Sequence, residues 1–475
     1  MRKVPVFIKK KETIRKCAVF VALVILSILC FWPQKSLGFP LSVEEERVMG
    51  EKFLAEVKNY FRFTDDQFAN QYINNLGHYL IRPLETKPFP FRFYIIKDNR
   101  LNAFAAPGGH IFIFLGLIET ADMVDELAAV ICHEIAHVSA RHLAQRIDQN
   151  KKIGLGTMAG VLAGALIGGK AGSAVVSGSV AAGIQTQLHF SRDDERQADQ
   201  LGFNYMDAAG FDPSCMVSVL NKIQKSQWHG TDRVPSYLLT HPTGPERMAN
   251  LDTMLSGYTV KTERSEAVRF RNQFPFFKTI IIAKSWSPSD SERFFKSELE
   301  KNPHSISAHF GLGVVLKEQS QYDPAIDHLQ KAMTESPDSL PILRLLGETL
   351  ILNNQNEEGV GVLEKVFKQD PQDKSTLLLL ANSYQDLEQY EKAIPLYKRL
   401  ISMEPVPNEV FHNLGVSYGR LDKLALAHYY FGIYFLRSGK RDKSVFHLRK
   451  AEGLSENDPA LRNQIRRAME ELNKR

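Results

Sequence analysis

The C-terminal half of this 475-residue chain repeats with a period of 34 residues. Proline recurs at that spacing, followed by a leucine, a small residue next to it, and a second small residue twelve positions later. The four series are Pro303, Pro337, Pro371 and Pro405; Leu312, Leu346, Leu380 and Leu414; Gly313, Gly347, Ala381 and Gly415; and Ala325, Gly359, Ala393 and Ala427. Four series in one register predict stacked helix pairs, because small residues let helices pack closely and neighbouring pairs bury one another's apolar faces.

The repeat resembles the tetratricopeptide repeat. This resemblance implies an α-helical superhelix whose concave face binds peptide or protein; the alternative is that the array packs on the N-terminal part and only shields its cleft. Beyond the four units we expect a further helix at 441–451 and a polar capping helix at 459–473. Upstream, residues 268–284 and 291–300 predict a degenerate helix pair, and the charged stretch 257–266 marks a domain boundary near residue 260.

A second feature is the string His133-Glu-Ile-Ala-His137, which spells H-E-x-x-H within a run of helical periodicity. Residues i and i+4 share one face of a helix, so two imidazoles can hold one Zn2+ there. Glu134 is then placed to act as general base on the attacking water. An apolar stripe precedes the motif and predicts a buried helix rather than a surface helix with two fortuitous histidines: Val124, Leu127, Ala128 and Ile131.

A hydrolytic zinc site needs a third protein ligand and an open position. The version H-E-x-x-H-x-x-G-x-x-H fails here, because Ala140 and Leu143 stand where it requires glycine and histidine. His142 is one residue away, and we expect it to point elsewhere. The other version takes a glutamate from a second helix. Glu195 and Asp199, four residues apart, predict a ligand and an orienter of a ligating histidine on one helical face.

These residues resemble the M48 family of zinc metallopeptidases over roughly residues 41–260. The motifs that carry the resemblance are His133-Glu-Ile-Ala-His137, Ser191-Arg-Asp-Asp-Glu195 with Asp199, Asn102-Ala-Phe-Ala-Ala-Pro-Gly-Gly109 with the apolar stretches 111–114 and 116–118, and Thr240-His-Pro242 with Glu246-Arg247. The resemblance implies His133, His137 and Glu195 as ligands of one zinc ion per chain. It also implies Glu134 as general base and Asp199 as orienter or proton donor.

His241 has two interpretations. It precedes Pro242, which favours extended backbone and hence a loop. In the family members that this chain resembles, the matching histidine can approach the zinc ion. His241 could therefore fill the open position as an autoinhibitory fourth ligand, or stabilise the transition-state oxyanion. The alternative is a loop histidine that packs near Arg247 or the next helix.

Two β-rich runs, 92–96 and 110–114, predict strands beside the motif helix, with a Pro-Gly-Gly turn ahead of the second. A strand at the cleft could accept an extended peptide as an added strand; an ordinary core hairpin is the alternative. The predicted fold is mostly α. A zincin-like α+β metallopeptidase domain with a small β-sheet at 39–260 is followed by an α-helical tetratricopeptide superhelix at 261–475.

Residues 1–38 have the pattern of an export signal, with seven basic residues ahead of the apolar run 17–32 and small residues at Ser36 and Gly38 for a cut. An uncleaved membrane anchor is the alternative. This segment holds eight Lys or Arg and one Glu, so the formal charge of +5 becomes −2 for the remainder. That balance argues against nucleic acid as a partner. We expect a periplasmic protein, with peripheral membrane association as an option.

Residues 153–184 form an insert rich in Gly and Ala between the two halves of the site. Small residues recur at every fourth position, as at Gly156, Gly160 and Gly164, which permits close helix packing. We expect a tight helical pair that acts as a lid or plug over the site or lies against a membrane. A transmembrane hairpin is the alternative.

The whole arrangement resembles a periplasmic group of M48 proteases that work on outer-membrane protein biogenesis. This implies a zinc-dependent endopeptidase of the cell envelope that acts on unfolded or misassembled proteins, with the repeats docking protein or peptide substrates or the outer-membrane assembly machinery. The chain departs from the group in one respect, since its repeats contain no cysteine. Two rivals remain: a chaperone or scaffold with a latent protease, and a membrane-embedded peptidase.

Overall fold

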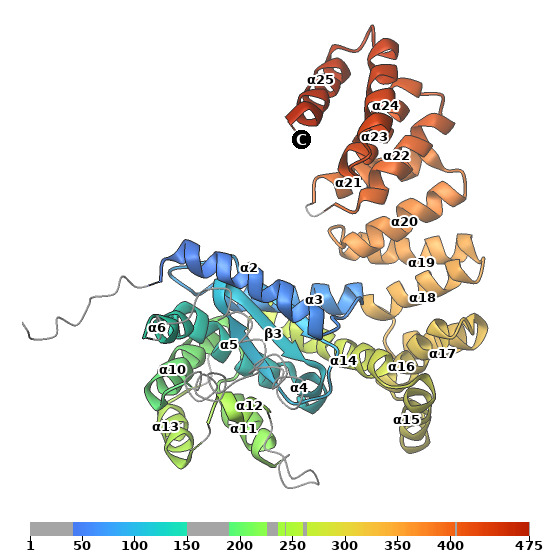
Figure 1. The fold of residues 1–475 in the computed structure, drawn as a ribbon. Coiled ribbons are helices and arrows are strands. Elements are labelled where there is room, and N and C mark those ends of the chain that lie inside the picture. Colours follow the sequence, from blue (N-terminus) through green and yellow to red (C-terminus); the bar gives the residue numbers. More distant parts are fainter. Residues whose placement is uncertain are drawn as a thin grey trace, which may run out of the picture.

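The computed structural model describes residues 41–149, 190–225, 236–242, 244–259, 264–403 and 406–474. Within them the chain is helical apart from one small sheet, which confirms the predicted fold class (Figure 1). Every helix in this part of the chain is too short or too polar to span a bilayer. The predicted export signal and the Gly/Ala-rich insert lie outside the described residues.

The sheet has three strands in the order β1-β3-β2, with β1 at Arg92–Ile96, β2 at Ala103–Ala106 and β3 at His110–Phe114. The two predicted strands, β1 and β3, pair in parallel, so they do not form a hairpin. The hairpin joins β2 to β3 through a turn in which Gly108 and Gly109 have φ of 76° and 86°. Glycine enters this region of φ without steric cost. The edge strand β2 was not predicted.

Side chains of β3 alternate between two cores, as the period of a strand requires. Ile111 and Ile113 join a core built from α3 (Gln67–Leu80), α5 (Val124–Ser139), α10 (Arg192–Ala209), α11 (Cys215–Lys225) and α14 (Ser265–Ser285). Phe112 and Phe114 face the opposite way, into a core with α2 (Val43–Tyr60) and α6 (His142–Gln149). The sheet is therefore covered on both faces, and α5 is buried along its length.

Helix α10 packs closely against α5. A capping box formed by Ser191 and Asp194 starts α10, and Gly210 with φ of 80° ends it. Gly202 lies at the crossing, where a Cβ atom would stand 3.3 Å from the backbone nitrogen of His133. The absence of a side chain at Gly202 thus lets the second helix of the site approach the first. Three short helices complete this part: α4 (Leu115–Thr120), α12 (Ser236–Thr240) and α13 (Pro245–Ser256).

The predicted repeats form four helix pairs. They are α16 (Ile306–Glu318) with α17 (Tyr322–Glu335), α18 (Leu340–Leu352) with α19 (Asn356–Gln369), α20 (Lys374–Asp386) with α21 (Tyr390–Ile401), and α22 (Asn408–Arg420) with α23 (Leu424–Arg437). The period also appears in the backbone, because the turns within the pairs hold non-glycine residues with positive φ at Ser320, Asn354, Glu388 and Asp422. The predicted flanking helices are present as α15 (Pro288–Lys301), α24 (Arg441–Leu454) and α25 (Pro459–Lys474).

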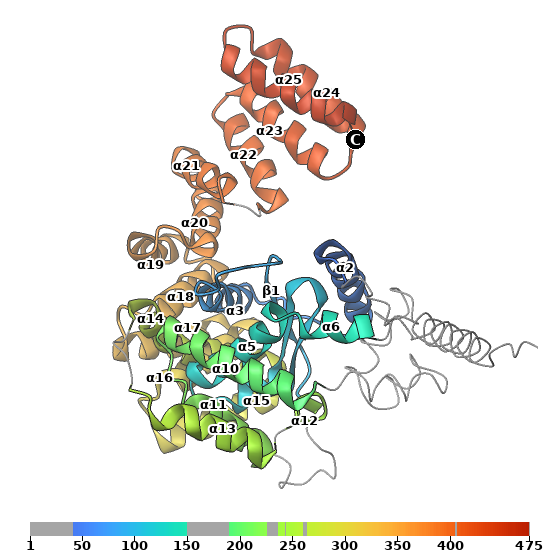
Figure 2. The same ribbon diagram turned by 90° about the vertical axis from the view of Figure 1, so that its left-hand side faces the viewer.

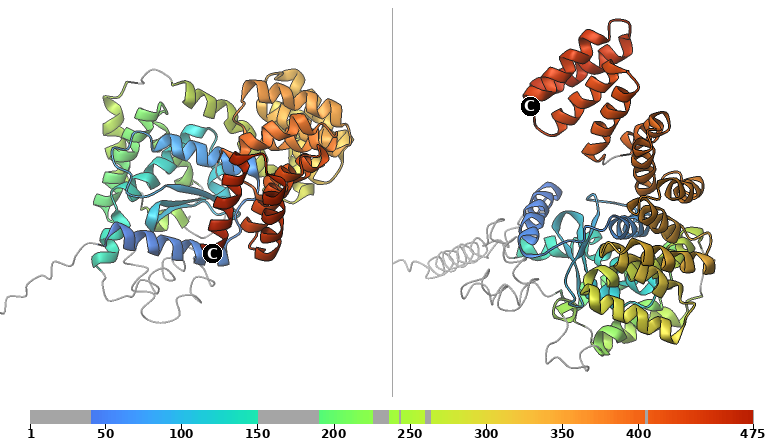
Figure 3. Two further views of the ribbon diagram at one scale, coloured as in Figure 1. Left: turned by 90° about the horizontal axis from the view of Figure 1, so that it is seen from above. Right: turned by 90° about the vertical axis from the view of Figure 1, so that its right-hand side faces the viewer.

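Helix α14 joins the two parts of the molecule. Its Phe274 and Phe277 belong to the N-terminal core, whereas Phe276 and Ile280 belong to the first core of the repeats. The first repeats also contact α3, because the Arg344 guanidinium lies 4.5 Å from the centre of the Phe68 ring. The last repeats, α22 to α25, project away from the N-terminal part (Figures 2 and 3). The predicted boundary near residue 260 stays a prediction.

Candidate metal centre

The two histidines of H-E-x-x-H lie on α5 and point to one spot. Their Nε2 atoms are 3.0 Å apart, and both side chains are buried. Both arise from the buried second half of α5, where each residue up to Val138 is enclosed by the core. The helical spacing therefore produces the convergence that the sequence predicted.

Glu195, in the first turn of α10, completes the cluster as predicted. Its Oε1 lies 3.4 Å from Nε2 of His137, and its Oε2 lies 3.4 Å from Nε2 of His133. The carboxylate is buried, and burial alone would raise its pKa. The charges of His241, Arg247 and His133 outweigh that effect and hold the pKa of Glu195 well below its usual range. Glu195 is thus an anion that faces two imidazoles.

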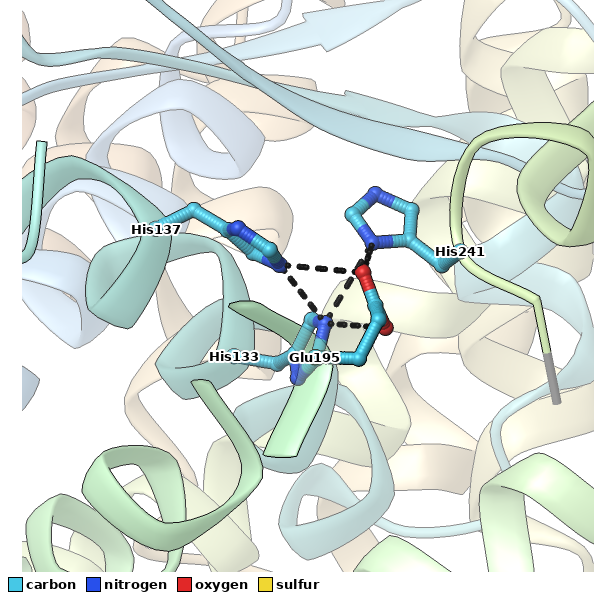
Figure 4. Close-up of side chains that lie close together, drawn as sticks. All are labelled: His133, His137, Glu195 and His241. Carbon is cyan, nitrogen blue, oxygen red and sulfur yellow. Dashed lines mark hydrogen bonds and ion pairs between the residues drawn. The ribbon is translucent and has the colours of Figure 1, made fainter. Parts of the chain in front are cut away.

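His241 follows α12 and reaches the same spot (Figure 4). Its Nδ1 lies 2.9 Å from Oε1 of Glu195 and 3.3 Å from Nε2 of His133. Its ring is fully buried and stacks on Tyr237 at 4.6 Å and on Phe190 at 5.2 Å between ring centres. Of the two interpretations of His241, the geometry favours the one in which it contacts the cluster.

The four side chains fit a metal ion. Their ligand atoms all lie within 4.8 Å of one another. The five contacts given above range from 2.9 to 3.4 Å. Four ligands at about 2.0–2.1 Å from one ion in a tetrahedron would be separated by about 3.3–3.4 Å. Three ring nitrogens and a carboxylate that converge in a buried space are otherwise hard to satisfy, because a neutral imidazole carries only one N–H.

Asp199 lies behind His133, one turn of α10 after Glu195. Its Oδ1 lies 3.0 Å from Nδ1 of His133, an ion-pair contact without hydrogen-bond geometry, and Nη2 of Arg247 lies 3.2 Å from the same nitrogen. A carboxylate behind a histidine ring suits a ring whose Nε2 lone pair faces the cluster. Burial would raise the pKa of Asp199, but the charge of Arg247 and the contact with His133 lower it. The sequence prediction that Asp199 lies next to a candidate ligand agrees with this geometry.

Arg247, on α13, is a residue whose role the sequence did not reveal. Its guanidinium donates two hydrogen bonds of 2.7 Å to Asp199, from Nε and Nη2. Its Nη1 also lies 2.7 Å from Oε2 of Glu195, an ion pair without hydrogen-bond geometry. Arg247 therefore holds both carboxylates. The sequence signal for this residue was its place in Glu246-Arg247, shortly after the His-Pro dipeptide. The partners of Arg247, however, lie about fifty residues earlier in the chain.

His142 is not one of the four side chains of the cluster, in agreement with the expectation that it points elsewhere. Its contact with His137 was not predicted. A continuous helix would turn residue 142 away from residue 137, but α5 ends at Ser139 and Arg141 has φ of 55°. The chain bends there, and α6 begins at His142. As a result Nδ1 of His142 lies 3.0 Å from Nδ1 of His137, and its Nε2 lies 2.9 Å from Oε1 of Gln197.

Glu134 is fully buried beside the cluster, and neither carboxylate oxygen has a hydrogen-bond partner among the described residues. Its nearest ionic contact is Nε2 of His241, 3.4 Å from Oε1. Burial raises the pKa of Glu134 to about 7. The charge of His241 is the largest effect that opposes this rise. The edge strand β2 packs against α5, the helix that carries Glu134. A cavity of about 270 Å³ opens beside Glu195 and Arg247.

Comparison with known proteins supports a metallopeptidase domain followed by helical repeats. Residues 67–255 match peptidase family M48, and residues 316–375 and 376–408 match the tetratricopeptide repeat. The Beta-barrel assembly-enhancing protease of Yersinia pestis is 28% identical over 320 residues, 66% of this chain and 64% of that protein. The protein of that name from Escherichia coli (strain K12) is 31% identical over 218 residues, 45% of each chain.

A more distant relative is the Mitochondrial metalloendopeptidase OMA1 of Schizosaccharomyces pombe, 28% identical over 179 residues, 37% of this chain and 50% of that protein. In each of these three pairs the match spans less than two thirds of the relative's own length. The resemblance drawn from the sequence motifs is confirmed: the chain carries a domain of peptidase family M48 followed by tetratricopeptide repeats.

Proposed function

We propose that this protein is a zinc-dependent endopeptidase of the cell envelope that cleaves unfolded or misassembled outer-membrane proteins. The observation that carries the proposal is the buried convergence of His133, His137 and Glu195 from two helices. Imidazole nitrogen and carboxylate oxygen at near-tetrahedral spacing form a donor set that suits Zn2+. We assign one zinc ion per chain to these three ligands.

Glu134 is the proposed general base. A bound zinc ion supplies Lewis acidity to the scissile carbonyl and lowers the pKa of water in the site. The Glu134 carboxylate is buried next to the ligands, and neither of its oxygens has a hydrogen-bond partner among the described residues. It can accept a proton from the attacking water near neutral pH and deliver it to the leaving amine.

Asp199 acts in this proposal as an orienter rather than as a proton donor. Both of its oxygens accept hydrogen bonds from Arg247, and Oδ1 also lies 3.0 Å from Nδ1 of His133. A carboxylate held in this way fixes the tautomer and ring plane of the ligand His133, and it has no proton to give.

His241 is the proposed fourth ligand of a resting, autoinhibited state. A hydrolytic site keeps one position open, and Nδ1 of His241, which contacts both Glu195 and His133, would occupy that position. Water and substrate can enter only if the loop that carries His241 moves away. The stacking of its ring between Tyr237 and Phe190 would stabilise the resting state.

The edge strand β2 suggests how substrate binds. β2 forms one border of the sheet and packs against α5, which carries Glu134, so an extended peptide could add to its outer edge. This mode requires an unfolded or locally extended segment. The names of the bacterial relatives support β-barrel proteins as substrates, and the repeats would dock them or the outer-membrane assembly machinery.

Three elements of this proposal stay predictions from the sequence: a peptidase part that ends near residue 260, an export signal at 1–38, and a lid at 153–184. Together with the bacterial relatives they support a periplasmic location. Peripheral association of the chain with a membrane is compatible with this proposal.

The test uses the Glu134→Gln variant of the full chain, with casein and an unfolded outer-membrane β-barrel protein as substrates. We expect wild-type protein to cleave both and the variant to bind zinc at wild-type stoichiometry without cleaving either. Turnover by the variant would refute the role of Glu134. Cells that lack the protein provide a second test. If the Glu134→Gln variant restores their lost function, the protein acts as a chaperone with a latent protease.

A further inference from the structure

We propose that His142 is a positioning residue, which fixes the tautomer and ring plane of His137 through a hydrogen-bonded relay that ends at Gln197. The proposal rests on the proposed function in one respect, since it assigns His137 as a metal ligand. It adds a residue that neither the H-E-x-x-H motif nor the downstream glutamate specifies.

The turn after α5 places His142 where the relay needs it. Ala140 keeps the helical backbone, and Arg141 reverses the chain with φ of 55°. The Arg141 side chain is itself held by α2, because its guanidinium bonds to Oε2 of Glu46 at 2.9 Å and to the carbonyl oxygen of Leu41. His142 is left with 1% of its surface exposed, against the ring of His137.

The proton positions in the relay follow from its two ends. If Nε2 of His137 carries the lone pair that faces the metal, the single N–H of that neutral ring is on Nδ1. Nδ1 of His137 therefore donates to Nδ1 of His142 over 3.0 Å. The N–H of His142 is then on Nε2, and it is donated to the amide oxygen of Gln197 over 2.9 Å. Each donor meets an acceptor, so the arrangement is complete in one protonation state.

The relay makes the two histidine ligands unequal. His133 is backed by the anionic Asp199, whereas His137 is backed by a neutral imidazole and an amide. One helix supports all three proposed ligands. Helix α10 supplies Glu195 itself, Asp199 behind His133, and Gln197 at the end of the hydrogen-bonded relay behind His137. An ion pair between Arg146 of α6 and Asp194 of α10 holds these two helices together.

The test compares two variants at residue 142. Phe in His142→Phe fills the volume but cannot accept a hydrogen bond, which leaves Nδ1–H of His137 unpaired. Asn in His142→Asn offers an oxygen near the position of the lost Nδ1. The readouts are the rate of Zn2+ loss to a chelator and the visible absorption spectrum of the Co2+-substituted protein, neither of which depends on turnover.

We expect His142→Phe to weaken Zn2+ binding about 10- to 100-fold and to change the Co2+ spectrum, as loss of such a contact typically does. His142→Asn should restore most of the affinity. Gln197→Leu removes the acceptor at the end of the relay and leaves the core intact. It should give a smaller loss of Zn2+ affinity, and it replaces His142→Phe in the test if that variant does not fold. Gln200→Ala, at an exposed position of α10, is the matched control and should behave as wild type.

Wild-type affinity and spectrum in His142→Phe, or equal losses in His142→Phe and His142→Asn, would overturn the proposal. Both outcomes leave Zn2+ binding by the wild-type protein intact. Failure of the proposed function is a different result, in which the wild-type chain binds no Zn2+ or Glu134→Gln still cleaves.

Discussion

Nδ1 of His241 lies 2.9 Å from Oε1 of Glu195, although 46 residues separate them in the sequence. The contact is buried, and a hydrolytic zinc site keeps one position open for water. In the proposed function this contact marks the closed state of the site, and the segment after α12 that carries His241 would control access to it.

Removal of this contact should activate the enzyme. We expect His241→Ala to bind Zn2+ and to cleave an unstructured peptide faster than wild type. In this variant no histidine ring occupies the position that water and substrate need. If the open form is about a tenth of the wild-type population, the gain in kcat/KM is about 10-fold. His304→Ala, at an exposed histidine of the repeats, is the control. Unchanged kinetics in His241→Ala would remove this residue from the site.

Arg247 should be indispensable for the stability of the apoprotein. Arg247→Met would leave the buried carboxylates of Asp199 and Glu195 without their cation, which costs about 3–5 kcal/mol for a broken buried pair. Arg247→Lys should restore little, because lysine cannot form the two-pronged contact with Asp199. Urea unfolding in the presence of a chelator measures both variants. A lysine variant as stable as wild type would contradict the role of the planar guanidinium.

Gly202 should be required for the spacing of the two site helices. Gly202→Val would place a branched side chain where even a Cβ atom stands 3.3 Å from the His133 backbone, so α10 must shift and carry Glu195 away from the histidines. We expect a loss of stability of about 1–3 kcal/mol together with weaker Zn2+ binding. Gly361→Ala on α19, where a Cβ meets nothing within 4 Å, should be tolerated. Wild-type Zn2+ affinity in Gly202→Val would show that the helix spacing is not limiting.

His110 should make folding stability depend on pH. Burial on β3 lowers its pKa to about 4, against about 6.5 in the unfolded chain. The unfolded chain therefore binds a proton between these values that the folded protein does not. The free energy of unfolding is therefore unaffected by protonation of His110 above pH 6.5 and falls as the pH drops toward 4. At pH 4.5 the loss is about 2–3 kcal/mol.

The variant His110→Phe should remove this dependence. Urea unfolding at pH 7 and pH 4.5 would show wild type losing about 2–3 kcal/mol more than the variant between the two conditions. At pH 7 the variant should be slightly less stable, because the 3.1 Å hydrogen bond between Nδ1 of His110 and the Tyr94 hydroxyl is lost. Equal pH dependence in both proteins would mean that His110 is protonated in the folded state.

Local periodicity explains which features the sequence could predict. The H-E-x-x-H helix and the 34-residue repeat depend on spacing within one or two turns or one unit, so α5 and the pairs α16 to α23 were predictable. Glu195 was found because it follows a helix start and matches a family motif. Strand β2 was missed because a short run rich in alanine has no strand signal of its own. It is a strand because it pairs with β3.

The contacts that the sequence did not predict at the site have tertiary causes. The contact of His142 with His137 was missed because the positive φ of Arg141 interrupts a pattern that reads as one helix. The role of Arg247 depends on two carboxylates from another helix, and no local pattern connects them. Contacts between segments that are far apart in the chain were thus predicted only where a family motif named both partners.

The most direct test is zinc K-edge X-ray absorption on purified wild-type protein and on Glu195→Ala. The wild-type chain should hold one zinc ion with nitrogen or oxygen ligands at about 2.0–2.1 Å, and the variant should lose most of its zinc and show fewer such ligands around the remainder. The exposed Glu246→Ala should match wild type. A wild-type protein without bound metal, or a Glu195→Ala variant with the same zinc content and spectrum, would contradict the account.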